Sequence, residues 1–397
     1  MKDLRNKWGV TIGCDPELFI IRTSGKVLKR TAVVGSERII PYKLVPGIDG
    51  SSVSRDGVQC ELHAGGQGGC RQGLAYYVAR ALTTLNNLVH VAKKKDPTIR
   101  VSFQPMVTLT KLDISSLSAD ALELNCKPSL NAYGRKAIHR DGATYPIRTA
   151  SGHLHLGTGL FGRSPAIDPD LGVKIFDLLV GIPTVLVDRD PSQRIRRETY
   201  GRAGEYRLPQ HGLEYRVPSN FWLRDYKLLS MVFGLAKLAI RVCEGLHKSG
   251  DASTKWAKDA ILDKVDFDEV ERSINENDFD GALRIYMTSI RPIVTQITPY
   301  YGFGKGLMDD FDYFIETTHA KGLKSWFDLD DRRILNSWLK LDSHQGWERF
   351  LTEIVEPRRH KSSFIGIILD PAKVLKTAKK RSGSITKAEQ ASLRLAA

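Results

Sequence analysis

Two acidic residues near the amino terminus, Asp15 and Glu17, flank Pro16 within a segment that otherwise has the composition of a β-strand, residues 10–21. Side chains two positions apart on a strand project from the same face, so both carboxylates would enter the same space. Two like charges held together are costly unless a cation neutralises them, which makes this pair a candidate cation site. The alternative is a turn or sheet edge with two solvated acids.

A pair of histidines lies in the segment Ser151–Gly157. His153 and His155 are also two positions apart, so both imidazoles would face one way while Leu154 and Leu156 face the core. Histidines at this spacing recur as metal ligands and as phosphate contacts. Two histidines hydrogen-bonded at a sheet surface are the alternative.

A third strand-like segment, Gly212–Val217, places Glu214 and Arg216 on one face. As a functional pair, the carboxylate would bind a metal and the guanidinium would hold a phosphate through two hydrogen bonds. As a structural pair, they would belong to a cross-strand array of ion pairs. Glu61, in a mostly apolar strand candidate at 57–63, is a further inward-facing carboxylate.

The stretch Arg194–Arg207 is rich in arginine, with tyrosine and glycine between the charges. Its arginines and tyrosines are Arg194, Arg196, Arg197, Tyr200, Arg202, Tyr206 and Arg207. Such a loop could bind polyphosphate through backbone amides and guanidinium groups, or nucleic acid through phosphate contacts and stacking. Taken in isolation, it is most typical of a solvated surface loop.

Together these clusters are typical of a site that binds magnesium and a nucleoside triphosphate. Magnesium takes carboxylate oxygens and phosphates as ligands. Four side chains suit this role: Asp15, Glu17, Glu61 and Glu214. The sequence contains neither a P-loop motif nor a kinase-type glycine-rich loop with its catalytic signature, which excludes these two phosphate-binding devices.

The elements that must position these residues change in type along the chain. Strands are predicted at 10–21, 57–63, 101–107, 121–125, 152–158 and 211–217, and helices at 72–94, 170–180, 221–246, 255–274, 278–290, 331–341 and 345–355. Because proline cannot donate a ladder hydrogen bond, the first strand should bulge or lie at an edge at Pro16. A strand-rich half (1–220) followed by a helix-rich half (220–397) favours an α+β fold over a doubly wound sheet.

The charge of the chain is concentrated at one end. The formal net charge is +14, and residues 357–397 contribute +8 of it, from ten Lys or Arg residues and two acids. This distribution indicates a near-ordinary body with a basic tail rather than a nucleic-acid-binding surface throughout. Five scattered cysteines form no CxxC pair, and no apolar run is typical of a signal peptide or a membrane span. We expect a soluble protein in a reducing, cytoplasmic compartment.

The order of the motifs resembles that of the phage carboxylate–amine ligase family (type 2), which is placed with the glutamate–cysteine ligase and glutamine synthetase superfamily. The resemblance covers about residues 9–235. The motifs are Gly13-x-Asp15-Pro16-Glu17, Glu61, Gly152-His153-Leu154-His155-x-Gly157, Tyr200-Gly201-Arg202-Ala203-Gly204-x-Tyr206-Arg207 and Gly212-Leu213-Glu214-x-Arg216. The segment Asn125–Tyr133 also looks like part of the phage group.

This resemblance implies a glutamine-synthetase-like funnel made by a curved, mostly antiparallel sheet with flanking helices, holding ATP and Mg²⁺, for which Mn²⁺ can substitute. It implies that ATP phosphorylates a carboxylate and that an amine attacks the acyl phosphate. By position, the metal ligands would be Glu17, Glu61, Glu214 and His155, with Asp15 in support. Arg216 would neutralise the transferring phosphoryl group, which His153 or His155 would contact. Nucleotide or substrate would be held by Tyr200, Arg202, Arg207 and Arg216.

We therefore expect a catalytic sheet region at 1–235, a helical part at 236–356 packed on it, and the basic tail at 357–397. The leading hypothesis is a phage-encoded, ATP-dependent ligase that joins the carboxylate of a small amino acid or peptide to an amine in the host cytoplasm. A non-catalytic phage structural or nucleic-acid-binding protein on the same scaffold is the second hypothesis, favoured by the tail. A metal-dependent hydrolase built on His153 and His155 is the third, and it lacks a clear third ligand of zinc type.

Overall fold

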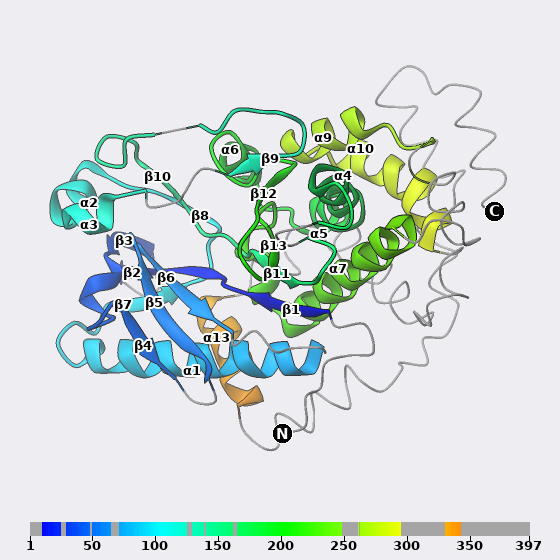
Figure 1. Ribbon diagram of the computed structural model, residues 1–397. Coiled ribbons are helices and arrows are strands. Elements are labelled where there is room, and N and C mark those ends of the chain that lie inside the picture. The colour runs from blue at the N-terminus through cyan, green and yellow to red at the C-terminus, as the bar shows by residue number, and fades with distance from the viewer. Residues whose placement is uncertain are drawn as a thin grey trace, which may run out of the picture.

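The computed structural model describes residues 10–24, 29–47, 50–64, 71–124, 129–138, 140–161, 165–247, 261, 263–294 and 330–342. Within them helices and strands are mixed, and the strands form antiparallel sheets that curl into a half-barrel (Figure 1). The predicted α+β class is confirmed at this level. The basic tail lies outside the described residues.

One sheet has the strand order β1-β11-β13-β12-β9, with every neighbouring pair antiparallel. Its strands are β1 (Thr11–Cys14), β11 (Leu154–Gly157), β13 (Gly212–Tyr215), β12 (Glu205–Arg207) and β9 (Leu130–Asn131). The predicted strands at 152–158 and 211–217 are therefore confirmed as central neighbours. Their pairing brings the histidine motif beside the Glu-x-Arg motif although the two are far apart in the sequence.

A second sheet has the order β3-β2-β6-β5-β4, and β7 also pairs with β2. Its strands are β2 (Glu17–Ser24), β3 (Lys29–Val34), β4 (Leu44–Pro46), β5 (Ser52–Asp56), β6 (Gln59–His63) and β7 (Ile99–Ser102). A two-stranded sheet, β8 (Met106–Thr108) with β10 (Ile147–Thr149), lies beside it. Glu17 on β2 stands directly opposite Glu61 on β6, so this register places two predicted site residues together.

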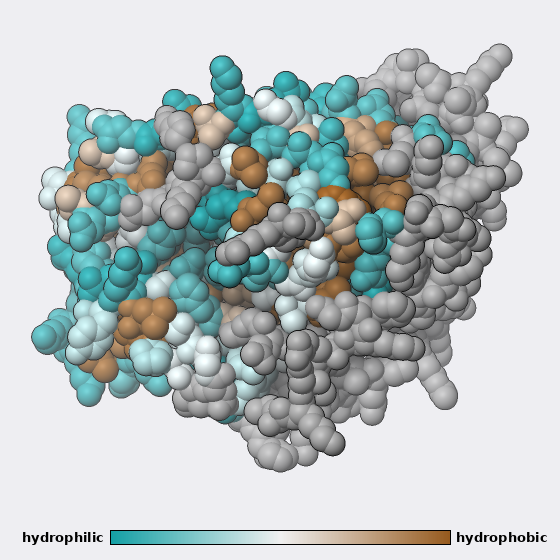
Figure 2. Space-filling model, viewed as in Figure 1, coloured by the Kyte–Doolittle hydropathy of each residue, from teal (hydrophilic) through white to brown (hydrophobic). Residues whose placement is uncertain are grey.

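The two larger sheets meet at Asp15 and Pro16, where β1 ends and β2 begins. The Pro16 carbonyl accepts a hydrogen bond from the Leu62 N–H (2.9 Å), and Glu17 N–H donates to the Ser151 carbonyl (2.8 Å). The predicted interruption of the strand at this proline is thus confirmed, since the chain leaves one ladder and enters the next there. In the space-filling view, hydrophilic residues gather over this junction (Figure 2).

Alternation along the strands separates a polar face from an apolar one in the first sheet. Gly13, His155, Glu214 and Arg207 stand side by side in register on one face. The residues between them, including Leu154 and Tyr215, face the other way and are buried in the main hydrophobic core. The polar face is therefore built by strands whose opposite side chains are fixed by core packing.

Helices cover the apolar faces. The first sheet is backed by α4 (Pro169–Phe176), the π-helical turn η3 (Asp177–Gly181), α5 (Ile182–Val187), α7 (Tyr226–His247), α9 (Phe267–Asn275) and α10 (Phe279–Ile285), which continues into η6 (Tyr286–Ile290) (Figure 1). The second sheet packs on α1 (Arg71–Lys93), which contacts α13 (Asp331–Leu341). No described helix is long and apolar enough to cross a membrane.

Most of the predicted elements are confirmed. The strand predicted at 101–107 is instead two short strands in different sheets, β7 and β8, and the strand predicted at 121–125 is wrong. Instead of a strand at 121–125, the chain forms the short helix α3 (Ala119–Leu122), because the Ser118 hydroxyl caps it by accepting from the Ala121 N–H. Of the helix predicted at 255–274, residues 267–274 are helical in α9, whereas residues 263–266 are not, because α9 begins after its N-cap Asp266. The helix predicted at 345–355 lies outside the described residues. The predicted helix at 331–341 is α13.

Candidate active site

One buried carboxylate, Asp15, sits between the two histidines of β11. Its Oδ2 lies 2.8 Å from His155 Nε2, and its Oδ1 lies 3.3 Å from His153 Nδ1. The antiparallel pairing of β1 with β11 produces this arrangement, because Gly13 is in register with His155 and Asp15 follows on the same face. The prediction that both imidazoles of the motif point one way is confirmed.

Glu214 completes this group from the next strand. Its two oxygens accept from Arg207 Nε (2.7 Å) and Nη2 (2.6 Å), and Oε1 lies 3.2 Å from Arg216 Nε and 3.5 Å from His153 Nδ1. The cross-strand ion pair that a purely structural role predicts is therefore present between Glu214 and Arg207. The same carboxylate also faces the histidine group, so the ion pair does not exclude a functional role.

These residues form a group that could hold a metal ion. One ligand atom from each of Asp15, His155 and Glu214 lies within 4.8 Å of the others. Among the described residues, Asp15 Oδ1, His153 Nδ1 and His155 Nε2 are buried and have no partner in hydrogen-bond geometry, although they approach one another closely. Buried polar atoms without hydrogen bonds are expensive, and carboxylate oxygens with imidazole nitrogens suit a divalent cation. The donor set therefore fits a metal.

A second group of carboxylates lies on the neighbouring sheet. Glu17 Oε2 accepts from the Ser151 N–H (2.8 Å), and Glu61 Oε2 accepts from the Ser54 hydroxyl (2.9 Å). Burial raises the pKa of Glu17 well above its usual value, and the nearby charges of Asp56, Glu61 and Asp15 raise it further. Several acids thus compete for few positive partners, a situation that a bound cation would relieve.

Asp15 and the two histidines of the motif shift one another's pKa values. Burial alone would raise the pKa of Asp15, but the facing His155 and His153 outweigh it and hold that pKa far below its usual range. Burial would lower the pKa of His155, and Asp15 reverses this and raises it. For His153, burial prevails and the pKa is lowered. The two histidines therefore differ in charge preference, with His153 the more readily neutral.

Tyr200 belongs to the same site and Arg202 does not contact its centre. The Tyr200 hydroxyl lies 3.0 Å from His153 Nε2 and accepts from Arg216 Nη2. Arg202 instead donates to Glu205 Oε1 (3.0 Å) and to the Lys136 carbonyl (2.9 Å), and it lines a separate pocket behind the loop. Of the residues predicted to hold nucleotide or substrate, Tyr200, Arg207 and Arg216 therefore lie in the carboxylate–histidine site.

Two arginines of the arginine-rich stretch have structural roles. Arg196 and Arg197 lie on the short helix α6 (Gln193–Arg197) and are buried. Arg196 donates to the Val217 and Pro218 carbonyls, and Arg197 donates to the Ile274 carbonyl at 2.6 Å. The prediction that they face a polyphosphate or solvent is wrong, because their donors satisfy backbone carbonyls inside the fold.

Three site residues were not predicted: Asp56, His63 and His211. Burial, together with Glu61 and Asp15, raises the pKa of Asp56 to about 6. His63 Nε2 lies 3.2 Å from Glu61 Oε2, and His211 Nε2 lies 3.2 Å from His155 Nδ1. The Asp56-Gly57 dipeptide is a strong hairpin signal, and it would have placed residues 52–56 opposite 59–63 with Asp56 on the face of Glu61.

Comparison with known proteins supports the resemblance over part of the chain. The sequence model of the family described as phage phiEco32-like COOH.NH2 ligase-type 2 matches residues 141–261. The matched range contains both histidines, Tyr200, Arg207, Glu214 and Arg216, whereas Asp15, Glu17, Asp56 and Glu61 precede it. No curated protein matches the chain. The fold thus joins carboxylates from outside the matched range to a matched set of histidines, arginines and one carboxylate.

Proposed function

We propose that the chain is an ATP- and Mg²⁺-dependent carboxylate–amine ligase, encoded by a phage, whose curled sheet forms a glutamine-synthetase-like funnel. One observation carries the proposal: Asp15 lies 2.8 Å from His155 and 3.3 Å from His153, which joins a carboxylate outside the matched range to the histidine motif inside it. The family match supports ligase chemistry, and the ligand group formed by Asp15, His155 and Glu214 supports a divalent cation.

The residues that would hold the cation are Asp15, His155 and Glu214, with Glu17 and Glu61 on the adjoining sheet. A bound Mg²⁺ or Mn²⁺ would supply charge neutralisation for phosphate oxygens. His211 Nε2 lies 3.2 Å from Nδ1 of His155, and this contact fixes the orientation of the His155 ring. Asp56 adds a further carboxylate to a site that already has more anionic than guanidinium groups.

The arginines would act on the phosphoryl group. Arg216 is 1% exposed and held by Glu214 and Ser129, so its guanidinium is fixed before any substrate arrives. A preorganised cation stabilises charge that develops on a transferring phosphoryl group. In the proposed reaction the substrate carboxylate oxygen bonds to the γ-phosphorus and ADP leaves. The nitrogen of the neutral amine then bonds to the carbonyl carbon, phosphate leaves, and the nitrogen loses one proton.

The test is an assay of ADP formation with Mg²⁺ and a panel of amino acids and amines, with product identification by mass spectrometry. We expect ADP in a 1:1 ratio with a new amide, only when a carboxylate and an amine are both present. Glu214→Gln should lower turnover by at least about a hundredfold, because it removes a ligand charge and one of the charges that hold Arg216. Asp120→Asn, on an exposed position of α3, is the matched control.

Two outcomes would contradict this proposal. ADP formation that is absent across the panel, together with binding of nucleic acid that survives moderate salt, would favour the non-catalytic alternative. Hydrolysis of an amide without ATP would instead favour the metal-dependent hydrolase.

A further inference from the structure

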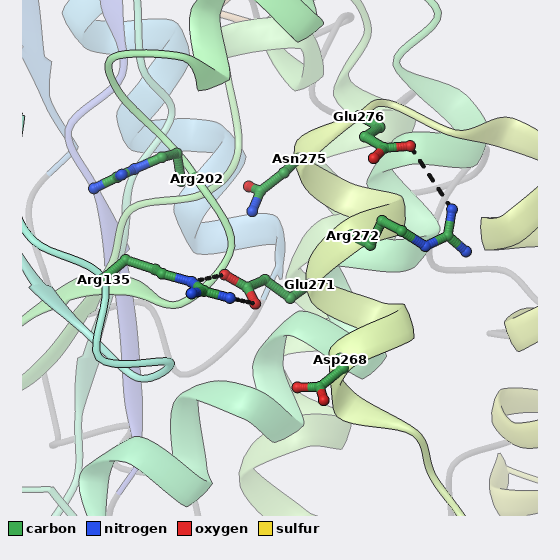
Figure 3. Close-up of a pocket in the computed structure, with 7 residues that line it drawn as sticks. All are labelled: Arg135, Arg202, Asp268, Glu271, Arg272, Asn275 and Glu276. Carbon is green, nitrogen blue, oxygen red and sulfur yellow. Dashed lines mark hydrogen bonds and ion pairs between the residues drawn. The ribbon is translucent and has the colours of Figure 1, made fainter.

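A pocket of about 570 Å³ lies between α9 and the segments that carry Arg135 and Arg202 (Figure 3). Its lining contains both charges: Arg135, Arg202 and Arg272, then Asp268, Glu271 and Glu276, together with Asn275. Five of these seven residues come from α9 and the residue after it, at positions that share one helix face. The volume is within the range of small-molecule sites, and no step of the proposed ligase reaction uses these residues.

Arg135 and Arg202, two of the arginines that line the pocket, are each held in place by a carboxylate. Arg135 Nε and Nη2 donate to the two oxygens of buried Glu271 at 2.7 and 2.8 Å, in a bidentate pair. Arg202 Nε donates to Glu205 at 3.0 Å, and its Nη2 donates to the Lys136 carbonyl. In the described part of the chain, Nη1 of Arg135 and of Arg202 makes no hydrogen bond. Two oriented guanidinium groups thus keep donors for a carboxylate.

The negative side of the pocket is supplied by Asp268. This residue is exposed, and among the described residues its carboxylate makes no hydrogen bond or ion pair. It projects from α9 on the same face as Glu271, one turn earlier (Figure 3). An ammonium group that bound here would therefore lie close to a carboxylate held by Arg135.

The pocket is physically connected to the candidate active site. Asn275 Oδ1 accepts from the Ala203 N–H (2.9 Å), and Glu205 Oε2 accepts from the Gly201 N–H (2.8 Å). These contacts fix the loop from the pocket side, while Tyr200 at its start contacts His153 on the other side. A ligand that binds Arg202 or Asn275 would thus act on the same short loop that positions Tyr200.

We propose that this pocket binds the ammonium and carboxylate groups of a free amino acid or peptide, at a ligand site separate from the groups that react in the proposed ligase reaction. Arg135 binds the carboxylate through Nη1, and Asp268 binds the ammonium. This binding does not depend on the proposed ligase function.

The test measures binding without ATP or metal, so it is independent of turnover. Isothermal titration calorimetry of the full chain uses the standard α-amino acids and glycylglycine as probes, followed by the N-acetyl and amide forms of the tightest one. We expect at least one zwitterionic probe to bind, and we expect blocking either charge to weaken it by about tenfold or more. Failure of every zwitterion to bind at millimolar concentration, or equal binding of the blocked forms, would overturn the proposal.

Three variants test whether the probe binds in this pocket. Asp268→Asn should weaken the probe by about tenfold or more, and so should the double variant Arg135→Gln with Glu271→Gln, which leaves no buried carboxylate unpaired. Asp263→Asn removes an exposed acid from the same region outside the pocket and should bind as the unaltered chain does. Equal affinity in all three variants would refute the assignment to this pocket. Binding that persists in a chain that forms no ADP would contradict only the ligase proposal.

Discussion

His155 Nε2 lies 2.8 Å from Asp15 Oδ2, across the antiparallel pairing of two strands that are distant in the sequence. The second oxygen of the same carboxylate lies 3.3 Å from His153 Nδ1. A carboxylate shared by two imidazoles, in a site that also holds Glu214, differs from the solvated acids and isolated histidines that each motif alone would permit. The junction of the two sheets at Asp15 and Pro16 brings the separate motifs together in one site.

Asp15→Asn should lower the affinity for Mn²⁺ or Mg²⁺ by about tenfold or more. The amide cannot carry the negative charge that compensates a divalent cation, and it removes the group that the two histidines share. Calorimetric titration with Mn²⁺ gives the affinity directly, with Asp120→Asn as the control for loss of an acid at an exposed position. Unchanged Mn²⁺ affinity in Asp15→Asn would show that this carboxylate only orients the imidazoles.

Local pattern was enough to predict the strands at 152–158 and 211–217 and the side chains that share their faces. Alternation determines which side chains point together, and Leu154 and Tyr215 anchor the opposite face in the core. Pattern could not show which strands are neighbours, because pairing depends on the whole chain. It also could not separate buried from solvated arginines: Arg196 satisfies backbone carbonyls that appear only after the loop at 217–218 folds against α6.

Tyr200→Phe should lower turnover of the proposed ligase by about tenfold to a hundredfold. The change removes a hydroxyl that contacts His153 Nε2 at 3.0 Å and accepts from Arg216, so both partners lose their orientation. Steady-state ADP formation measures the effect. Tyr206→Phe is a matched control, because its hydroxyl donates to Asp170 (2.7 Å) away from the histidine group, and it should retain turnover. Equal losses in both variants would indicate a structural cause.

Gly201→Ala should destabilise the fold and displace the Tyr200 loop. Gly201 has φ +71°, and a Cβ there would lie 2.2 Å from Nη1 of Arg196, whose buried guanidinium donates to the Val217 and Pro218 carbonyls. Gly134 has φ +69° with nothing within 4 Å of its Cβ, so Gly134→Ala isolates the backbone strain, on the order of 1 kcal/mol. Thermal denaturation should show a distinctly larger loss for Gly201→Ala. Equal losses of thermal stability in the two variants would mean that the Arg196 side chain moves away from the new Cβ without destabilising the fold.

Asp177→Asn should stabilise the protein increasingly as the pH rises from about 4 to 7. Asp177 is buried behind the first sheet, where its Oδ1 accepts from the Tyr215 hydroxyl at 2.7 Å. Burial raises its pKa from 3.8 to about 7, although the hydrogen bond from Tyr215 offsets part of this effect. Between these two values the folded state holds a proton that the unfolded chain has lost, so the free energy of unfolding falls as the pH rises. Above about pH 7 both states are ionised and the penalty is constant.

The asparagine variant has no such titration, and it keeps an acceptor for Tyr215. Its free energy of unfolding relative to the unaltered chain should therefore grow by up to about 1.4 kcal/mol per pH unit across this window. Other buried acids, such as Asp188 with a pKa raised by burial to about 6, contribute equally to both proteins and cancel in the difference. Urea denaturation of both proteins at pH 5, 6, 7 and 8 measures this difference in the free energy of unfolding. A difference that stays constant over this range would show that Asp177 is already ionised in the folded protein at pH 5.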